Sequence, residues 1–297
     1  MWFGVDDGSS PVGPSDITFS EETSETSLKD VNLQISKPFD FSGRVALITG
    51  GGTGIGRATA IGFAEHGADV VLAGRKLGAL EETAAMVAAL GRRATVVPTD
   101  VKDAQACEAL ARAAQAAHGR VDFLVNNAGG SRAKDYLSWT LTDFDDMIAL
   151  NLRSVWVLTR AVAPHIRAAG GGAVVNISSG ASLFPVPHSS PYGAAKAAVN
   201  NLTAVMAVDL ANWGIRVNCV APGTIKSEGY VRAMDRMELD PDVAGGQNLV
   251  RRAGLPDEIA WPILFLCSPA AGFINGETIN VAGGPVGWRQ HGPVHAE

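Results

Sequence analysis

Tyr192 and Lys196 stand four residues apart in a stretch whose pattern predicts a helix, so both side chains lie on one helix face. A tyrosine with its ordinary pKa near 10 exchanges protons poorly at neutral pH, but a lysine ammonium beside it favours the phenolate and lowers that pKa. Ser179 ends an apolar run thirteen residues earlier, where its hydroxyl could hold a substrate oxygen. The three residues could therefore move a proton to or from that oxygen, although a Tyr-x-x-x-Lys pair alone is usually a surface pair.

A glycine-rich turn lies near the start of the patterned part of the chain. It follows the apolar run 45–48 and opens a helical pattern at 55–66. Strand, glycine turn and helix in this order are typical of a phosphate site, because glycine allows positive φ and the helix start offers unpaired N–H groups. Taken alone, the turn could be only a tight loop. The residues expected to contact a cofactor here are Gly50, Thr53, Gly54, Ile55 and Gly56.

Short apolar runs alternate with helical patterns from Arg44 onward. This alternation predicts an α/β fold: a single doubly wound Rossmann domain with a seven-stranded parallel sheet flanked by helices. Its ligand should lie at the carboxyl ends of the strands. The expected strands are 44–49, 69–73, 94–98, 121–125, 173–178, 215–220 and 278–282. The expected helices are 55–66, 78–90, 103–118, 142–169, 191–213 and 257–268.

The end of the second expected strand indicates which dinucleotide is bound. A carboxylate at this position would bind an adenosine ribose diol and repel a 2′-phosphate. The chain has Arg75 and Lys76 instead, and Arg57 is a further candidate cation. Because guanidinium and ammonium groups suit a phosphate, we expect NADP(H) to be preferred, with NAD(H) possible. The alternative is that Arg75 caps a surface loop and stacks on adenine.

Two further strand ends carry polar or small residues. Asp100, next to Val101, could accept a hydrogen bond from an adenine amino group. The fourth strand ends in Asn126, Asn127, Ala128 and Gly129, where an Asn can bridge neighbouring strands and small residues leave space for a cofactor. Alone, this last segment would be no more than a turn.

These features occur in a fixed order along the chain: the glycine turn, Asn-Asn-Ala-Gly at 126–129, Ser179, the Tyr192/Lys196 pair and Pro222-Gly223. The ordered set resembles the short-chain dehydrogenase/reductase family from about Phe41 to Gly284. That resemblance implies hydride transfer between a nicotinamide and a carbonyl or alcohol, with the protein aligning and polarising the reactants.

The resemblance also implies a role for each matching residue. Tyr192 would be the general acid/base, Lys196 would tune it, Ser179 would orient the carbonyl, and Asn151 would anchor a proton relay through a bound water. Each of these alone is more often structural. The residues implied to hold the nicotinamide end are Pro222, Gly223, Ile225 and Ser227, with Ser227 where the family commonly has Thr. Ala282 replaces a common Asp, which puts a structural or inter-subunit contact in doubt.

Two segments are expected to shape the substrate site. Residues 228–250 look irregular and would form a mobile lid bearing Met234 and Met237, unless they are a plain helical connection packed on the core. The apolar loop 180–191 would line the other wall. We therefore expect a small lipophilic ketone or alcohol, such as a steroid, acyl or terpenoid-like compound.

Other functions within and outside the family stay open. Several segments resemble both hydroxysteroid dehydrogenases and NADPH-dependent enoyl-CoA or 3-oxoacyl reductases, so reduction of an enoyl-CoA C=C bond is an alternative. A non-catalytic NADP(H)-binding sensor is an alternative of another class. Because such a sensor typically lacks the tyrosine and lysine, Tyr192 and Lys196 argue against it.

Composition and charge limit the remaining possibilities. The formal charge is −6, and residues 1–40, an acidic extension expected to be largely disordered, account for all of it. The domain, residues 41–284, is followed by a tail, 285–297. Because residues 41–297 are balanced and contain no basic block, we expect no nucleic-acid partner. The chain has no run of roughly 18 apolar residues, so no membrane span is expected.

The cysteines and histidines suggest compartment and metal content. Cys107, Cys219 and Cys267 are widely separated, which favours reduced thiols in a cytoplasmic protein. The six histidines form no ligand cluster with acids or cysteines, so we expect no metal. The Ala-rich helices 103–118 and 142–169 carry excess apolar surface, which indicates a homo-oligomer, a tetramer or a dimer.

Overall fold

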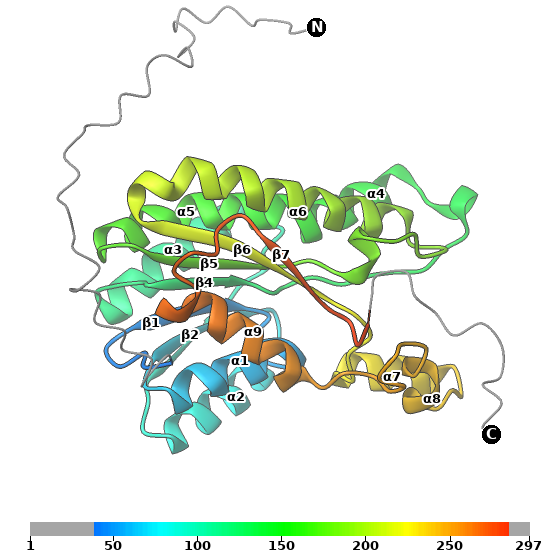
Figure 1. The fold of residues 1–297 in the computed structure, drawn as a ribbon, viewed down its shortest axis with the longest axis horizontal. Helices are drawn as coiled ribbons and strands as arrows, with labels where there is room; N and C mark the ends of the chain where they lie inside the picture. Colours follow the sequence, from blue (N-terminus) through cyan, green and yellow to red (C-terminus); the bar gives the residue numbers. More distant parts are fainter. Residues whose placement is uncertain (1–38, 285–297) are drawn as a thin grey trace, which may run out of the picture. The chain divides into compact units, whose positions relative to one another are not determined.

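The computed structural model describes residues 39–284, apart from the side chains of Val243 and Ala244. The predictions made for residues 1–38 and 285–297 lie outside this range. The described residues contain a seven-stranded, wholly parallel sheet of order β3-β2-β1-β4-β5-β6-β7 (Figure 1), which confirms the predicted fold class. The strands are β1 Val45–Thr49, β2 Asp69–Gly74, β3 Ala94–Pro98, β4 Phe123–Asn126, β5 Gly172–Ile177, β6 Ile215–Pro222 and β7 Thr278–Val281.

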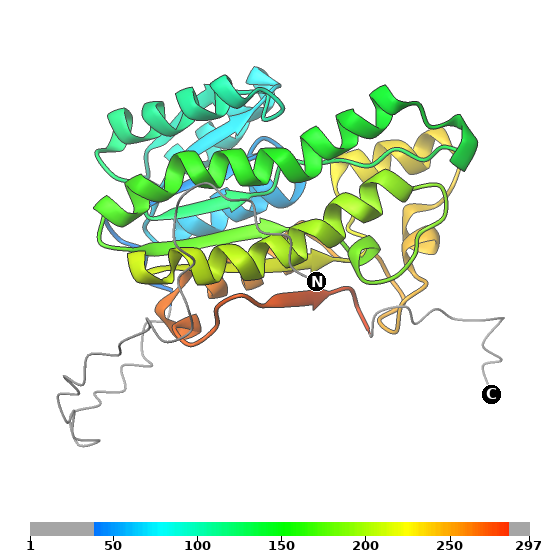
Figure 2. The same cartoon turned by 90° about the horizontal axis from the view of Figure 1, so that it is seen from above.

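Helices cover both faces of the sheet. Figures 1 and 2 show α1, α2 and α9 on one face and α3, α5 and α6 on the other. The predicted helix 142–169 is wrong in one respect, since a π-helical turn at 149–153 separates α4 from α5. The helices are α1 Gly54–Glu65, α2 Leu77–Ala89, α3 Ala104–His118, α4 Leu141–Ile148, α5 Ser154–Ala168, α6 Ser190–Leu210, α7 Glu228–Arg236, α8 Pro241–Gly245 and α9 Pro256–Cys267.

Alternation along each strand divides the core into two layers. Ile48 packs with Phe63 and Ile263 on the α1/α9 face, whereas its neighbour Leu47 packs with Leu158 on the α5 face. All five of these side chains are at most 1 % exposed. Burying each contributes roughly 1.5–3 kcal/mol. Because the sheet is buried on both faces, its strands read as apolar runs rather than as alternating patterns.

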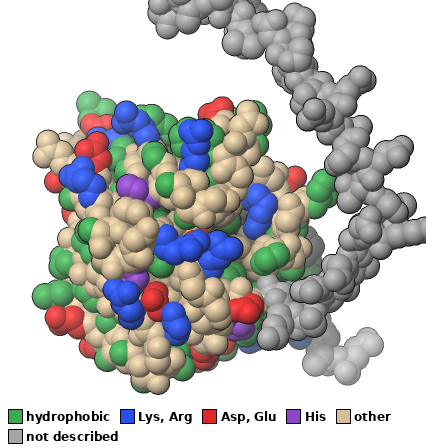
Figure 3. Space-filling view, turned by 90° about the vertical axis from the view of Figure 1, so that its left-hand side faces the viewer, with side chains coloured by type: hydrophobic (Ala, Val, Ile, Leu, Met, Phe, Trp, Pro, Cys, Tyr) green, Lys and Arg blue, Asp and Glu red, His purple; other side chains and the backbone are tan. Residues whose placement is uncertain are grey.

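The amino ends of the strands carry paired charges. Asp122 is fully buried and accepts hydrogen bonds from the side chains of Arg44 (2.8 Å) and Arg120 (2.6 Å) and from the amide of Val45 (2.9 Å). Figure 3 views this end of the molecule, where basic side chains lie with acidic ones among them. The pairing ties the start of β1 to the start of β4, so these arginines have a structural partner.

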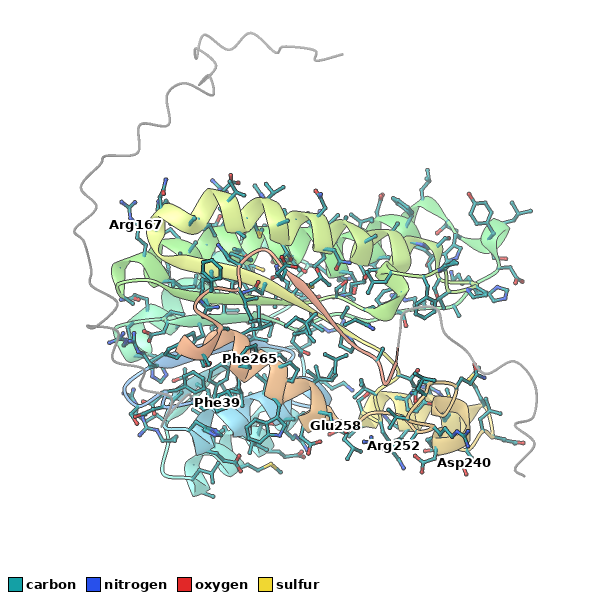
Figure 4. All side chains as sticks on the ribbon, viewed as in Figure 1. Phe39, Arg167, Asp240, Arg252, Glu258 and Phe265 are labelled. Atoms are coloured by element: carbon teal, nitrogen blue, oxygen red, sulfur yellow. The ribbon has the colours of Figure 1, made fainter. Side chains whose placement is uncertain are left out.

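The predicted lid segment, residues 228–250, is more regular than expected. Ser227 caps α7 by accepting a hydrogen bond from the amide of Tyr230 at 3.3 Å. None of the α7 residues is buried, so it is not a helix packed into the core either. Beyond this segment, Arg252 forms two hydrogen bonds to Glu258, which Figure 4 shows at the end of α9 nearest the lid segment.

Two observations concern membranes and metals. In residues 39–284, no helix has the length and apolar character that crossing a bilayer requires. Within the same range, no three His, Cys, Asp or Glu side chains come together as a metal-binding group. Cys107, Cys219 and Cys267 are each buried and free, in line with the expectation of core thiols.

Candidate active site

A cleft of about 640 Å³ lies at the carboxyl ends of the strands. It is at the position where the strand order reverses between β1 and β4, as expected for a doubly wound sheet. Apart from Gly56, Asn151 and the further candidate cation Arg57, all residues predicted as catalytic or cofactor-binding line it. These are Gly50, Thr53, Gly54, Ile55, Arg75, Lys76, Asp100, Val101, Asn127, Ala128, Gly129, Ser179, Tyr192, Lys196, Pro222, Gly223, Ile225 and Ser227.

The glycine turn forms the floor of the cleft because side chains are excluded from it. Gly50 has φ +66°, and a Cβ there would lie 2.7 Å from the side-chain nitrogen of Asn127. A Cβ on Gly56 would collide with the carbonyl oxygen of Gly50. Gly56 was expected to contact a ligand, but the structure places it behind the turn, where its role is to let α1 pack closely.

Two unpaired cations lie in the cleft wall after β2. Arg75 and Lys76 are exposed, and neither side chain forms an ion pair or hydrogen bond within residues 39–284. The third candidate, Arg57, does not line the cleft. Its guanidinium is held by the carbonyl oxygen of Gly52 at 2.7 Å and by Glu82 at 3.0 Å. The suggestion that Arg57 supplies a further charge to a bound phosphate is therefore wrong.

Asparagine side chains join neighbouring strand ends, as the sequence predicted. The Asn127 side-chain amide donates to the carbonyl oxygen of Thr49 at 2.8 Å, and its backbone amide donates to the Thr49 hydroxyl at 3.0 Å. Asn126 similarly donates to Asn176 at 2.8 Å across β4 and β5. Asp100 accepts from the amide of Lys102 at 3.0 Å, which fixes its carboxylate at the cleft edge.

Tyr192, Lys196 and Ser179 meet in the cleft. Lys196 is only 3 % exposed, its Nζ donates to the carbonyl oxygen of Ile177 at 2.8 Å, and that nitrogen is 5.9 Å from the centre of the Tyr192 ring. Burial lowers the pKa of Lys196 to about 8. The Lys196 ammonium therefore loses its proton at a pH only slightly above neutral.

The pKa of Tyr192 differs from the expectation. The sequence predicted that Lys196, together with a positively charged nicotinamide, would lower it. Among the protein's own groups, burial raises the pKa of this phenol, and the opposing effect comes from a hydrogen bond with Ser179. The Lys196 ammonium is bound to the Ile177 carbonyl and lies over the ring face. The protein alone thus keeps Tyr192 protonated, the form that can donate a proton.

Asn151 lies beside the cleft and not in its wall. It is fully buried in the π-helical turn, where its oxygen accepts from the amide of Gly130 at 3.1 Å and its nitrogen donates to the Gly130 carbonyl at 3.0 Å. A Cβ on Gly129 would lie 2.9 Å from the Asn151 oxygen and 3.3 Å from Lys196 Nζ. Asn151 and Lys196 therefore flank one glycine, while the relay role of Asn151 stays a prediction.

Only one of the two predicted substrate walls, the lid segment 228–250, contributes residues to the cleft. No residue of 180–191 lines it, nor do Met234 and Met237, and Met237 is 64 % exposed. The lid segment instead contributes Gly229, Tyr230 and Arg232. All three lie in the segment 228–250 that the sequence predicted to form the lid, with Tyr230 among its expected residues. Gly229 and Arg232 were not singled out, although the Ser227 cap, with Glu228 in the following turn, could have located the start of α7. The other lining residues not predicted are Gly52, Gly74, Ala79, Leu80, Thr99, Gly130, Ser131, Leu150, Ile177, Ser178 and Thr224.

Comparisons with known proteins agree with this geometry. The family profile described as enoyl-(acyl carrier protein) reductase matches residues 50–285. The chain is 36% identical over 256 residues to 2-dehydro-3-deoxy-D-gluconate 5-dehydrogenase of Escherichia coli, covering 84% of this chain and 98% of that protein.

Solved structures give the same result. The 7α-hydroxysteroid dehydrogenase complexed with NADH and 7-oxo glycochenodeoxycholic acid has a TM-score of 0.79 and 36% identity, covering 84% of this chain and 97% of that one. The L-sorbose reductase of Gluconobacter frateurii complexed with NADPH and L-sorbose has a TM-score of 0.81 and 30% identity, covering 84% and 99%. The chain belongs to the short-chain dehydrogenase/reductase family, whose members are oxidoreductases of alcohols and ketones.

Proposed function

We propose that this protein is an NADP(H)-dependent oxidoreductase that interconverts a lipophilic ketone and its secondary alcohol. The observation that carries the cofactor preference is a pair of cations, Arg75 and Lys76, whose side chains have no ion pair or hydrogen bond within residues 39–284. They lie in the cleft wall, where a carboxylate would select NAD(H). One solved relative was complexed with NADH and the other with NADPH. The residues of this wall would therefore set the preference of this protein between the two dinucleotides.

The cleft fits a dinucleotide. The glycines leave the backbone of the turn without side chains, so a phosphate can approach it. Asp100 provides a hydrogen-bond acceptor beyond the two cations. Pro222, Gly223 and Ile225 line the same cleft from the end of β6. A nicotinamide dinucleotide, when bound there, supplies or accepts the hydride.

Side chains of the protein transfer the proton to and from the substrate oxygen. Tyr192, kept protonated by burial, donates its phenolic proton to the substrate oxygen in the reductive direction and takes it back in the oxidative direction. Ser179 holds that oxygen beside the phenol. Lys196 places a charge under the ring below about pH 8. The protonated phenol is the form that the reductive direction requires.

A lipophilic substrate is supported by exposed apolar residues in the segments that follow β4 and β5. Leu137 is 94 % exposed and Leu183 is 41 % exposed. Their two loops are joined where the amide of Lys134 donates to the carbonyl oxygen of His188 at 2.9 Å. Inside the cleft, Leu150 adds apolar surface. The relative complexed with a 7-oxo bile acid fits this proposal, whereas the relative complexed with L-sorbose offers a polar alternative.

Reduction of an enoyl thioester is the second candidate, because the matching family profile is described as an enoyl-(acyl carrier protein) reductase. The hydrogen bond between Ser179 and Tyr192 favours carbonyl chemistry, since it brings two hydroxyls to one oxygen. The sensor alternative has no such support: both Tyr192 and Lys196 lie in the cleft, as catalysis requires.

We further propose a cytoplasmic homo-oligomer, a tetramer or a dimer. Large apolar side chains are exposed on helix faces and near the sheet edge: Trp156 (48 %), Val208 (77 %) and Phe273 (105 %). Such surface suits burial against further copies of the chain. The three free, buried cysteines suit a reducing compartment. Light scattering at several protein concentrations measures the oligomeric state, and a monomer at all of them would contradict the oligomer.

The test is a Tyr192→Phe variant assayed with lipophilic ketones, polar sugars and enoyl-CoAs, using NADPH and NADH in parallel. Turnover should fall by at least about 100-fold because the proton donor is lost, while NADPH affinity is retained. Tyr136→Phe is the matched control, since Tyr136 is 78 % exposed and does not line the cleft. Unchanged turnover in Tyr192→Phe would contradict the mechanism, and faster turnover of sugars than of every lipophilic ketone would contradict the substrate class.

A further inference from the structure

The lid segment is bound to the glycine turn through one carboxylate. Glu228 is the first residue of α7, and its Oε2 accepts a hydrogen bond from the amide of Gly54 at 2.7 Å. Its Oε1 is 3.5 Å from a guanidinium nitrogen of Arg57. A Cβ on Gly54 would lie 3.0 Å from Cβ of Ser227, so the start of α7 and the turn are in close contact.

The Gly54 amide is a group that a bound phosphate would also need. Gly54 begins α1, and its N–H is one of those left without a partner inside the helix. The Thr53 side chain does not cap this end. An anion here is stabilised by the amide and by the helix dipole, whether it is a phosphate or a carboxylate. Since one N–H makes one strong hydrogen bond, Glu228 and a phosphate compete for it.

Arg232 carries a positive charge, which suits a phosphate, whereas Glu228 carries a negative one. It lies four residues after Glu228 on α7, so both side chains are on the same helix face. Arg232 lines the cleft, is exposed, and forms no ion pair or hydrogen bond through its side chain within residues 39–284. Because the two side chains are about one helical turn apart, a shift of α7 by roughly 6 Å along its axis would exchange one side chain for the other over the turn. Because no α7 residue is buried, such a movement disrupts little packing.

We propose that Glu228 is a built-in competitor for the dinucleotide phosphates and that Arg232 replaces it when the cofactor binds. Glu228 leaves the Gly54 amide, α7 moves, and Arg232 pairs with the phosphate at the glycine turn. The proposal rests on the proposed function in that it requires a dinucleotide in this cleft. It makes Glu228 and Arg232 determinants of cofactor affinity and predicts that the lid segment moves upon cofactor binding, before any substrate enters.

The experiment measures binding and lid movement and does not depend on turnover. NADPH is titrated by its fluorescence into wild type, Glu228→Gln and Arg232→Gln. Glu228→Gln should bind NADPH about tenfold more tightly, because a neutral amide competes less well than a carboxylate. Arg232→Gln should bind about tenfold more weakly and with a smaller dependence on salt. Asp235→Asn is the matched control: it also removes an acid from α7, but from a residue outside the cleft and without an ion pair in the described part of the chain.

Hydrogen exchange of wild type adds a readout that requires no variant. Amides of α7 should change their exchange rates when NADPH is added without substrate. Equal NADPH affinity in Glu228→Gln and wild type, or α7 exchange that NADPH leaves unaltered, would show that the Glu228 contact is a fixed brace and would overturn the proposal. A wild-type protein that binds neither NADPH nor NADH would overturn the proposed function and this inference together. Tighter NADPH binding that is confined to Glu228→Gln supports both the proposed function and this inference.

Discussion

Replacing Lys196 by methionine tests whether a catalytic group is held at a cost to the fold. Lys196 is 3 % exposed, and the only hydrogen-bond acceptor that the structure gives its Nζ within residues 39–284 is the carbonyl oxygen of Ile177 at 2.8 Å. Burial lowers its pKa from 10.5 to about 8. The charged form is therefore less stable in the folded protein than in the unfolded chain, and methionine removes that charge while keeping the length of the side chain.

The magnitude follows from the size of this pKa change. A fall from 10.5 to about 8 corresponds to roughly 3 kcal/mol of lost stability while the lysine is charged. Methionine also removes the hydrogen bond to Ile177 and leaves a buried acceptor, which costs about 1–3 kcal/mol. The two effects oppose each other, so at neutral pH the free energy of unfolding should change by no more than about 2 kcal/mol, in the stabilising direction if burial dominates.

The pH dependence is the more decisive measurement. Above about pH 8 the folded protein loses the Lys196 proton while the unfolded chain keeps it, so protons favour unfolding and wild-type stability rises with pH toward 10.5. Between pH 7 and 9.5 the wild type should therefore gain about 2 kcal/mol relative to Lys196→Met. Denaturant unfolding at fixed protein concentration measures this difference.

Other titrating groups near Lys196 set the control. Cys219 interacts with Lys196, and burial raises its pKa to about 11, so Cys219→Ala is compared in both backgrounds. The Tyr192 pKa is raised above 10, outside most of the pH range used. Parallel stability curves for wild type and Lys196→Met would refute the reasoning, because they would show that the lysine titrates normally. Lost turnover in Lys196→Met is expected in either case.

Two further predictions concern the cofactor cleft. Arg75→Gln should weaken NADPH binding by about tenfold and leave NADH binding nearly unchanged, since only the 2′-phosphate loses a partner. Arg112→Gln, outside the cleft, is the control. Equal losses of affinity for both dinucleotides in equilibrium titrations would contradict the assignment of Arg75 to the 2′-phosphate. Gly56→Ala should lower the free energy of unfolding by about 1–3 kcal/mol, because the new Cβ meets the backbone oxygen of Gly50 and neither can yield easily. Gly78→Ala in α2, with open space around the new methyl, should instead stabilise slightly, and equal melting temperatures for the two variants would show that the turn can relax.

The parts of the site that the sequence predicted are those where backbone geometry restricts residue type. Gly50 needs a positive φ and Gly56 has no space for a Cβ, so the glycines mark the turn. The carboxyl ends of parallel strands meet at one edge, so the short polar segments after the expected strands belong to one cleft. Tyr192 and Lys196 follow from helical spacing. Each of these inferences uses local sequence and one rule of topology.

The failures involve electrostatics and exposed helices. The pKa of Tyr192 depends on burial and on the hydrogen bond that directs Lys196 to Ile177, neither of which the spacing of two residues reveals. Arg57 looked available in the sequence but is held by Gly52 and Glu82. The π-helical turn that buries Asn151 likewise has no simple sequence signal.

The contact between Glu228 and Gly54 shows why the lid segment is the hardest part to predict. The two residues are 174 positions apart, and an acid at the start of an exposed helix is an ordinary feature that stabilises the helix by itself. Only the fold shows that this acid meets the start of a second helix, α1, where a phosphate would also be stabilised. The same dipole argument that predicts the phosphate site from the glycine turn therefore predicts its competitor, once the two helix starts are known to meet. A chain with its acid at position 228 and its base at 232 carries both charges on one helix face, so moving that helix can change the sign of the charge at the turn without any change in the turn itself.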